Sequence, residues 1–502
     1  MIASIIQLFL VFILSCLTLF YFFSRSNYGY WKKRGVPYDQ PKLFFGSLSF
    51  LMRTSAWDVF YDLSKKYKCD YFGIFLSWKP ALVINSKELA KKVLVKENDS
   101  YQDRYISSGA EDDPLGALNL FTIKSPQWMQ IRHEITPTLT SMRLKAITEI
   151  MNSNATEVVN RIQKDHVDSN KPVDLKNLFS MYTSDTIAYN VFGIRVSSLK
   201  ELTSPVLAIT RYMIRWNFWR GLEFTLFFLL PAVAKFFRMK LLSHTANEYI
   251  KKLYHEVVAE REKTGQTGDK DLVSHLLKSN ANSKLPAESG SQYAEKLMMA
   301  QAGFFILGAM ETSSTTMSYI LYELAHHPDE QEKLYEELSA ALNESGKDVL
   351  DYDDLLKVKY LTACIHETLR LHPPVPHLDR MCNKKCQLTD ELTIEAGTPV
   401  FVNVVSIHYN GDYYPDPEQW RPERFNDSTD TDNHDFTFIP FGDGPRFCIG
   451  KRYAMMQIRA VIAQIIKKYR IKPDGPHTWQ TDPYSVFLRP KHGGRVKFIP
   501  RS

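Results

Sequence analysis

Residues 441–450 decide the fold: they read F-G-D-G-P-R-F-C-I-G and run directly into a helical pattern that begins at Lys451. The stretch places one cysteine, Cys448, in a glycine-rich turn at the start of a helix. Free backbone N–H groups and the helix dipole favour negative charge there, so we expect Cys448 to be a thiolate. Such a thiolate can ligate iron or support nucleophilic chemistry, whereas an isolated cysteine in a loop is more often structural.

The spacing F-x-x-G-x-R-x-C-x-G resembles the haem-binding loop of the cytochrome P450 family. The resemblance implies that Cys448 is the axial thiolate of haem b, donating electron density that favours O–O cleavage. It implies that Arg446 pairs with a haem propionate, because a guanidinium suits a carboxylate, and that Phe441 packs against the macrocycle. Gly444 would permit the tight turn, and Gly450 would let the following helix approach the ring.

Composition favours one large domain. The chain has 502 residues, of which 44% are hydrophobic, and no long Gly/Ser/Pro linker interrupts it. We therefore expect a mainly α fold with small β-sheets (α+β), which is the fold that the resemblance implies. The net charge of +6 is modest for this length, which argues against a nucleic-acid-binding protein.

The cysteine pattern indicates free thiols in a reducing compartment. The spacing shows neither the framework of a small secreted domain nor a second Cys/His pair at zinc-site distance. The six cysteines are Cys16, Cys69, Cys364, Cys382, Cys386 and Cys448.

The N-terminus predicts a membrane anchor. Residues 1–24 carry no charge, and a helix of this length can cross a hydrocarbon core about 30 Å thick. A cleavable signal peptide is the alternative, but the run has no basic segment before it and no small-residue cleavage site. Basic residues follow instead, at Arg25, Lys32, Lys33 and Arg34, which keeps the body of the chain on the cytosolic face.

The chain therefore divides into a single-span anchor, a basic and proline-containing hinge at 25–46, and a catalytic domain at 47–502. Pro37 and Pro41 disfavour a helix in the hinge, and a similar segment follows the anchor of microsomal cytochromes P450. We expect Trp31, beside the basic residues, to lie at the lipid headgroups.

Two further segments carry structural predictions. Alternation at 71–75 and 80–84 predicts two strands of a small sheet. Residues 216–237 are rich in aromatics, but charges and Pro231 interrupt them, so they do not predict a second span. Contact with the membrane interface, as in the F–G region of membrane-bound family members, and burial in the core are the two interpretations.

Residues 295–327 predict a long helix that contains Gly308-Ala309-Met310-Glu311-Thr312-Ser313. The segment resembles the distal helix of the family, whose acid and threonine pass protons to iron-bound dioxygen. The resemblance implies a catalytic relay of Glu311 and Thr312. A threonine that bonds back to the i−4 carbonyl is the structural alternative. Ala309 departs from the usual glycine, which makes the relay geometry less secure than the iron ligation.

A buried brace is expected from a second motif. Glu367 and Arg370 are spaced i, i+3 on one predicted helix face, and Arg424 follows in P-x-R-F. In the family these three positions form a triad that supports the haem loop. The resemblance therefore implies a structural brace of Glu367, Arg370 and Arg424.

Other cations match the family's propionate contacts. Trp128 and Arg132 match its W-x-x-x-R helix, and Arg380 matches an arginine after the proline turn. Arg104 is a further candidate on spacing. By position relative to the family's substrate-contacting segments, the expected substrate pocket contains Phe121, Phe305, Ala309, Val375 and Phe487.

The hinge and the T-S-D-x-I pattern at 183–187 are most similar to the insect microsomal branch, family 6. The resemblance implies a monooxygenase of the endoplasmic reticulum that inserts one oxygen atom from O2 into lipophilic substrates. Xenobiotics such as plant toxins or insecticides are the expected class, with hormones and fatty acids as alternatives. A haem-thiolate isomerase or dehydratase and a haem-based sensor or carrier are the competing functions.

The implied partners are the lipid bilayer, an NADPH-dependent cytochrome P450 reductase and, as an additional candidate, cytochrome b5. No nucleic acid is expected. We expect the reductase to dock on the Cys448 side, where a basic patch could form from Arg143, Lys145, Lys451 and Arg452.

Overall fold

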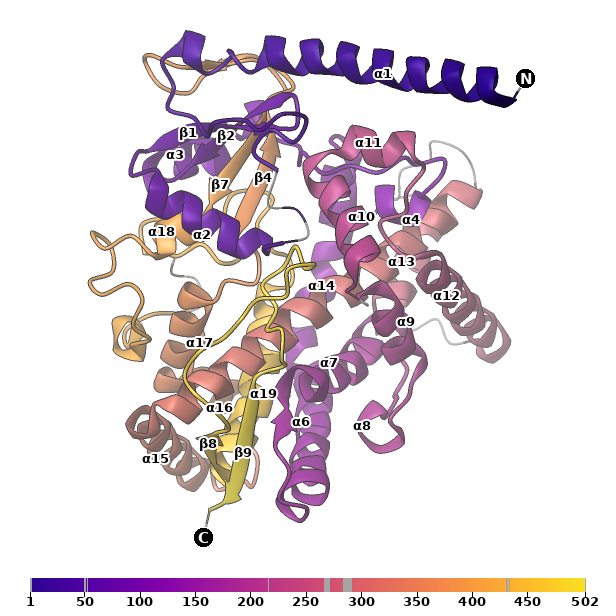
Figure 1. Cartoon of the computed structure of the whole chain (residues 1–502). Coiled ribbons are helices and arrows are strands. Elements are labelled where there is room, and N and C mark those ends of the chain that lie inside the picture. Colours follow the sequence, from indigo (N-terminus) through magenta and orange to yellow (C-terminus); the bar gives the residue numbers. More distant parts are fainter. Residues whose placement is uncertain are drawn as a thin grey trace.

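Helices dominate the structure, and the strands gather in three small sheets (Figure 1). This arrangement confirms the predicted mainly α fold. The computed structural model describes residues 2–48, 51, 53–214, 216–265, 271–282, 291–429, 432 and 434–501.

The largest sheet has four strands in the order β1-β2-β7-β4. Its strands are β1 (Tyr71–Leu76), β2 (Lys79–Ile84), β4 (His377–Met381) and β7 (Pro399–Asn403). β1 and β2 pair antiparallel with Tyr71 opposite Ile84, so the two strands predicted in this region are confirmed. The other sheets are formed by β3 (Val173–Asp174), β8 (Tyr469–Pro473) and β9 (Arg495–Pro500), and by β5 (Cys386–Gln387) and β6 (Thr393–Ile394).

The long helix α14 (Ser291–His326) crosses the middle of the molecule (Figure 1) and confirms the helix predicted at 295–327. The segment has no proline before Pro328. The Pro328 ring cannot continue α14, and Pro328 is instead the first residue of α15 (Pro328–Ser345). α14 packs against α7 (Leu175–Phe192), α17 (Lys359–Leu371) and α19 (Lys451–Lys468).

Shorter helices surround this core. They are α2 (Ala56–Lys66), α3 (Lys87–Lys91), α4 (Pro114–Ala117), α5 (Gln127–Ile135), α6 (Ser141–Ile162), α8 (Ser198–Glu201), α9 (Pro205–Met213), α10 (Phe218–Leu229), α11 (Pro231–Phe236), α12 (His244–Thr264), α13 (Leu272–Ala281), α16 (Tyr352–Lys357) and α18 (Val404–His408).

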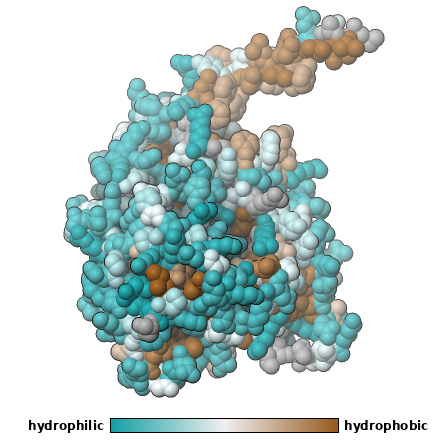
Figure 2. Space-filling view, turned by 60° about the horizontal axis from the view of Figure 1, so that its bottom comes forward, coloured by the Kyte–Doolittle hydropathy of each residue, from teal (hydrophilic) through white to brown (hydrophobic). Residues whose placement is uncertain are grey.

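Helix α1 (Ile2–Asn27) stands outside the body of the protein. It is the one helix in the described part of the chain that is long and apolar enough to cross a membrane, and its apolar window is 0% buried. Figure 2 shows it as a hydrophobic rod on a largely hydrophilic surface. Only its C-terminal end meets the body of the protein, where Phe20 stacks on Phe44, so the exposed apolar length is suited to an apolar surrounding such as a bilayer.

The segment after α1 packs onto the sheet. Trp31 is 0% exposed, its ring lies against the Cα of Gly73, and its indole N–H donates to the Ile74 carbonyl at 3.1 Å. The expectation that Trp31 lies at the lipid headgroups is therefore wrong. Gly73 has no side chain, which makes room for the indole that anchors this segment to β1.

The segment 216–237 is partly buried in the core and partly exposed, so each of the two interpretations holds for part of it. Proline cannot continue a helix, and Pro231 separates α10 from α11. Phe224 and Phe228 on α10 are buried, whereas Trp219, Phe236 and Phe237 are 72%, 80% and 63% exposed. In Figure 1 α11 lies on the same side of the molecule as α1.

Candidate functional site

The Cys448 loop is a turn that only glycine can complete. Gly442 and Gly444 have φ of 69° and 72°, in the left-handed region, and a Cβ at Gly444 would collide with the Leu94 carbonyl oxygen. The Cys448 N–H donates to the Phe441 carbonyl at 2.9 Å, which closes the turn. Gly450 then caps α19, so the cysteine lies just before a helix N-terminus, as predicted.

The loop does not by itself make Cys448 a thiolate. The side chain opens onto a cavity and is exposed there, but the protein that surrounds it raises the pKa of the thiol by desolvation. The Gly450 N–H, Arg132 and Arg104 oppose this shift without cancelling it. A thiolate at Cys448 is therefore favoured when a further positive charge is present, such as a bound metal ion, which deprotonates a coordinating thiol.

A single cavity contains the sulfur of Cys448 and all five predicted substrate-pocket residues. Phe121, Phe305, Ala309, Val375 and Phe487 line it from separate parts of the chain. The long helix α14 forms the wall that also carries Gly308, Glu311 and Thr312.

The far part of the cavity is aromatic. Phe121 stacks on Phe304 with ring centroids 5.2 Å apart, and Phe228 meets Phe487 edge-on at 6.2 Å. Phe228 and Phe224 come from the 216–237 segment, so the buried half of that segment forms cavity wall. Its aromatic density was the only sequence signal for this role. An apolar wall of this kind favours a lipophilic ligand.

Thr312 and Glu311 both line the cavity, but each already has a partner. The Thr312 hydroxyl donates to the Gly308 carbonyl at 2.7 Å, which is the back-bonded arrangement of a threonine within a helix. The helix is continuous through Ala309, with no break at the position where glycine is usual.

Glu311 is clamped by two cations that the sequence did not indicate. Its carboxylate lies 3.0 Å from the Lys176 Nζ and 3.4 Å from Arg489 Nη1, and its side chain is 1% exposed. Lys176 also donates to the Glu311 carbonyl at 3.1 Å and to the Ser314 hydroxyl at 2.5 Å. Desolvation opposes ionisation of Glu311, yet the two cations hold its pKa below the usual value. Burial lowers the pKa of Lys176 to about 8.

The predicted brace residues come together. Arg370 donates twice to Glu367, from Nε at 2.7 Å and from Nη2 at 2.8 Å, and Arg424 Nε lies 3.3 Å from the same carboxylate. The Glu367 and Arg370 side chains are 0% exposed. A buried bidentate pair of this geometry holds a helix and a loop in fixed relation.

His408 links the brace to the segment before the cysteine loop. Its Nδ1 lies 3.0 Å from the Arg370 carbonyl, and its Nε2 accepts from the Ile439 N–H at 3.1 Å. These partners fix a neutral tautomer with the proton on Nδ1. Burial, together with the charge of Arg370, lowers the pKa of His408 to about 3.

Arg446 is buried at the edge of the cavity and lies over the Trp128 ring at 4.2 Å. It donates from Nε to the Gln102 carbonyl at 2.6 Å and from Nη2 to Asp103 at 3.0 Å. Its Nη1 has no hydrogen-bond partner among the described residues. Burial, with Arg104 nearby, lowers its pKa to about 9, so an anion at this edge would stabilise the guanidinium.

Arg132 and Arg104 also line the cavity, whereas Arg380 does not. Arg380 is 1% exposed and donates to the Asp379 carbonyl at 2.8 Å. Its Nε has no hydrogen-bond partner among the described residues, and the propionate contact of Arg380 stays a prediction. His377, three residues earlier on β4, lines the cavity, and the sequence analysis missed it.

Together these groups fit haem b. Arg104, Arg132 and Arg446 supply positive charge at the cavity, and the orphaned Nη1 of Arg446 is a donor suited to a carboxylate. On the thiol side, a Cβ added at Gly450 would meet only the Cys448 sulfur, at 3.9 Å, so glycine leaves open space beside the ligand atom. Phe441 lines the same region.

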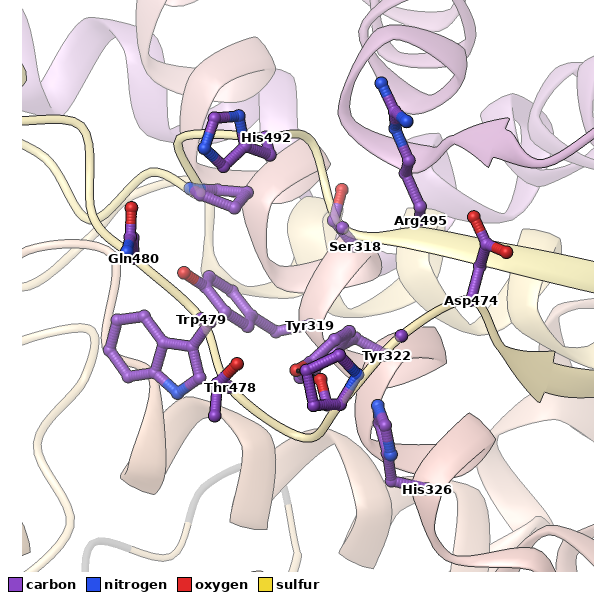
Figure 3. Close-up of a pocket in the computed structure, with 14 residues that line it drawn as sticks. Ser318, Tyr319, Tyr322, His326, Asp474, Thr478, Trp479, Gln480, His492 and Arg495 are labelled. Carbon is purple, nitrogen blue, oxygen red and sulfur yellow. Dashed lines mark hydrogen bonds between the residues drawn. The ribbon is translucent and has the colours of Figure 1, made fainter.

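A second cavity lies between α14 and the C-terminal segment (Figure 3). It has aromatic walls and a polar rim but no cysteine, and none of the predicted site residues lines it. Its walls include Tyr319, Tyr322, His326, Trp479 and Arg495. It is therefore distinct from the predicted haem site.

The predicted basic patch is partly neutralised. Lys145 forms an ion pair with Asp353, although both side chains are exposed. Lys451 lies over the Phe441 ring at 5.5 Å, next to the cysteine loop, and Arg452 is exposed.

Comparison with known proteins agrees with this geometry. The family model Cytochrome P450 matches residues 36–498. Cytochrome P450 6l1 of Blattella germanica is 32% identical and covers 99% of this chain and 98% of its own length. Cytochrome P450 6j1 of the same organism is 31% identical over 93% of this chain and 92% of its own length. A probable cytochrome P450 6g2 of Drosophila melanogaster is 29% identical, with 95% of each covered.

The family match spans the cysteine loop, the brace and the helix that carries Glu311 and Thr312, and the relatives align over almost their entire lengths. The cavity has the ligand atom, the cations and the open glycine that haem b requires. The chain belongs to the cytochrome P450 family.

Proposed function

We propose that this haem-thiolate monooxygenase oxygenates lipophilic xenobiotics, such as plant toxins or insecticides, with electrons that a reductase delivers from NADPH. The proposal rests on the cavity, because Cys448 lines the same space as the aromatic side chains of Phe121, Phe304 and Phe487. Such a chamber binds apolar molecules by burying their surface and contains few groups that would fix one particular substrate. Hormones and fatty acids are the less favoured classes.

In this proposal Cys448 holds the iron of haem b, and Arg132, Arg104 and Arg446 hold the propionates, with Trp128 beside them. Bound haem b supplies the redox chemistry that activates O2. Phe441 and Gly450 shape the protein surface that receives the ring. Glu367, Arg370 and Arg424 fix the loop and have no direct part in the reaction.

Thr312 and Glu311 would hold and move protons on the substrate side. The Thr312 hydroxyl, which now donates to the Gly308 carbonyl, can turn toward the cavity by rotation of its side chain. Glu311 is kept ionised by Lys176 and Arg489, so it can accept a proton and then release it.

The carbon monoxide difference spectrum of the reduced protein tests the ligand. We expect the band of a thiolate-ligated haem in the full chain and its loss in Cys448→Ala. A band typical of an imidazole ligand in the unaltered chain would contradict the assignment of Cys448.

Turnover tests the reaction. With reductase, NADPH and a panel of plant toxins, insecticides and endogenous lipids, we expect O2 uptake and oxygenated products. Product formed without NADPH would favour an isomerase or dehydratase. Neither product nor O2 uptake across the panel would favour a sensor or carrier.

Thr312→Ala tests the relay against a matched control. Thr183 in α7 makes the same type of back bond, to the Phe179 carbonyl at 2.8 Å, but does not line the cavity. We expect Thr312→Ala to lower the product formed per NADPH consumed and Thr183→Ala to leave that ratio unchanged. Equal ratios in the two variants would contradict a relay role for Thr312.

We further propose that residues 1–24 anchor the chain in the endoplasmic reticulum membrane, with 25–46 as the connecting segment and 47–502 on the cytosolic face. The unburied helix α1 and the exposed cations that follow it support this orientation. Exposed Trp219, Phe236 and Phe237 would rest on the same bilayer. Release of the chain from microsomes by carbonate, or protection of the body from added protease, would contradict it.

The reductase would dock on the Cys448 side, with cytochrome b5 as a second donor. Arg452 is exposed there and follows directly after the loop and cap of α19. We expect Arg452→Glu to raise the reductase concentration needed for half-maximal turnover, without altering the carbon monoxide spectrum. An unchanged reductase dependence would remove Arg452 from the docking surface.

A further inference from the structure

Cys382 and Cys386 form a close pair of thiols outside the haem cavity. Their sulfur atoms are 3.9 Å apart, and both cysteines are free. Cys382 is 0% exposed, whereas Cys386, at the start of β5, is partly exposed. The other four cysteines are Cys16, Cys69, Cys364 and Cys448, and none of them has a second sulfur among its hydrogen-bond partners.

We propose that Cys382 and Cys386 are a modification site, at which hydrogen peroxide forms a reversible disulfide that disturbs the seat of Arg446. The effect on the haem rests on the propionate role proposed for Arg446. Formation of the disulfide itself does not depend on that role.

The chemistry balances with peroxide as the only oxidant. Peroxide takes two electrons from the accessible Cys386 sulfur, which becomes a sulfenic acid while one oxygen leaves as water. The Cys382 sulfur then attacks the Cys386 sulfur, the S–O bond breaks, and a second water leaves with the thiol proton. A dithiol reverses the reaction by exchange.

The two cysteines differ in access and reactivity. Burial raises the pKa of the Cys382 thiol to about 12, with the Cys386 sulfur contributing, so Cys382 is not the first to react. The backbone of Cys382 is fixed by hydrogen bonds from its N–H to the Thr398 carbonyl at 3.0 Å and from the Gly397 N–H to its carbonyl at 2.7 Å. Closing the sulfur–sulfur distance from 3.9 Å to about 2.05 Å turns the Cys386 sulfur toward Cys382 and away from its present partner, Tyr101.

Movement of Cys386 reaches Tyr101. The Cys386 thiol donates to the Tyr101 hydroxyl oxygen at 2.9 Å, and Tyr101 is 0% exposed. A disulfide has no S–H, so this donor disappears when the bond forms. The buried hydroxyl then loses a partner, which favours a shift of the segment that carries it.

The Tyr101 segment also holds Arg446. Gln102 accepts from Arg446 Nε at 2.6 Å, and Asp103 accepts from its Nη2 at 3.0 Å. Asn383, next to Cys382, grips the same segment by donating to the Ser100 carbonyl at 2.7 Å and to the Asp103 carboxylate at 3.0 Å. Oxidation therefore acts on residues that hold the propionate arginine from two sides.

Peptide mapping tests the site directly. Lys384 and Lys385 lie between the two cysteines, so trypsin separates residues 381–384 from 386–424 unless a disulfide joins them. After treating the haem-loaded full chain with peroxide, we expect these two peptides to be recovered as the dominant cysteine-linked pair, and to separate after dithiothreitol. A chain oxidised elsewhere but not joined here would overturn the site.

Absorption spectra of the same samples test the coupling. We expect peroxide to shift the haem absorption band of the unaltered chain and dithiothreitol to restore it. Cys386→Ser should lack the reversible shift, and Cys69→Ser, a matched control at a partly exposed cysteine without a sulfur partner, should keep it. A disulfide that forms without any reversible shift would overturn the coupling, although the modification site would stand.

Discussion

Lys176→Met removes one of the two cations that hold Glu311 while keeping a side chain of similar length in its place. The Lys176–Glu311 pair is separated by 3.0 Å, with side-chain exposures of 5% and 1%. We expect the variant to lose stability and to bind a proton at Glu311 at a higher pH than the unaltered chain. The substitution tests whether the Lys176–Glu311 ion pair contributes to the free energy of unfolding.

The magnitude follows from burial. At 3.0 Å and an effective dielectric constant of about 20, two unit charges attract by about 5.5 kcal/mol, but desolvation offsets much of this. Deleting one partner of a buried pair costs about 3–5 kcal/mol because the other charge is left uncompensated. Arg489 remains 3.4 Å from Glu311, so we expect a loss near the lower end, about 3 kcal/mol.

Urea unfolding followed by circular dichroism measures this loss, and Lys65→Met is the matched control. Lys65 pairs with Glu418 at 2.9 Å, almost the same distance, but the two side chains are 54% and 59% exposed. Exposed pairs contribute about 0–1 kcal/mol, so the control should lose much less stability. Lys176→Met combined with Glu311→Gln removes both charges and should recover most of the loss.

Two outcomes would refute the reasoning. If Lys176→Met loses no more stability than Lys65→Met, the buried clamp contributes nothing beyond a surface pair. If the double variant is as unstable as Lys176→Met alone, the loss comes from packing around the lysine stem and not from the uncompensated Glu311 charge.

Three further predictions concern the loop and its brace. Gly444→Ala should lose about 1–3 kcal/mol more than Gly346→Ala in urea unfolding, because both have positive φ but only Gly444 would collide with the backbone at Leu94; equal losses would contradict this. Glu367→Gln should cost about 3–5 kcal/mol and weaken haem retention, whereas Glu248→Gln, which alters a solvent-exposed pair of the same i, i+3 spacing, should change neither measurably. The His408 pKa is about 3 in the folded chain, below its value in the unfolded chain. The stability that this neutral histidine contributes is therefore complete above about pH 6.5. As the pH falls from there toward 3, this stability decreases by about 1.4 kcal/mol per pH unit. His408→Gln should flatten that part of the pH–stability curve, and an unchanged slope would contradict the assignment.

The sequence predicted the parts of the site whose residues are close together along the chain. Cys448 and its glycines lie within ten positions, and Glu367 with Arg370 within four, so local spacing alone preserved the pattern. The Glu311 clamp was not predictable, because Lys176 and Arg489 are separated from Glu311 by 135 and 178 positions. Only the folded chain brings these cations together.

The error over Trp31 has a clear physical origin. Trp31 lies among cations, which is typical of a headgroup residue, but the missing side chain at Gly73 gives it a buried site that composition does not reveal. Residue type suggested a role for Trp31, and the backbone around Gly73 decided its position.

The segment that carries Phe487 and Arg489 has an evolutionary consequence. Phe487 lines the substrate chamber, and Arg489, two positions later, holds the ionised Glu311. A substitution at Phe487 that is selected for a new substrate must leave the backbone in place, because Arg489 has to reach the Glu311 carboxylate. We therefore expect substitutions to be tolerated better at Phe121 or Val375 than in the C-terminal segment. Both residues line the cavity, and the residues next to them do not pair with Glu311.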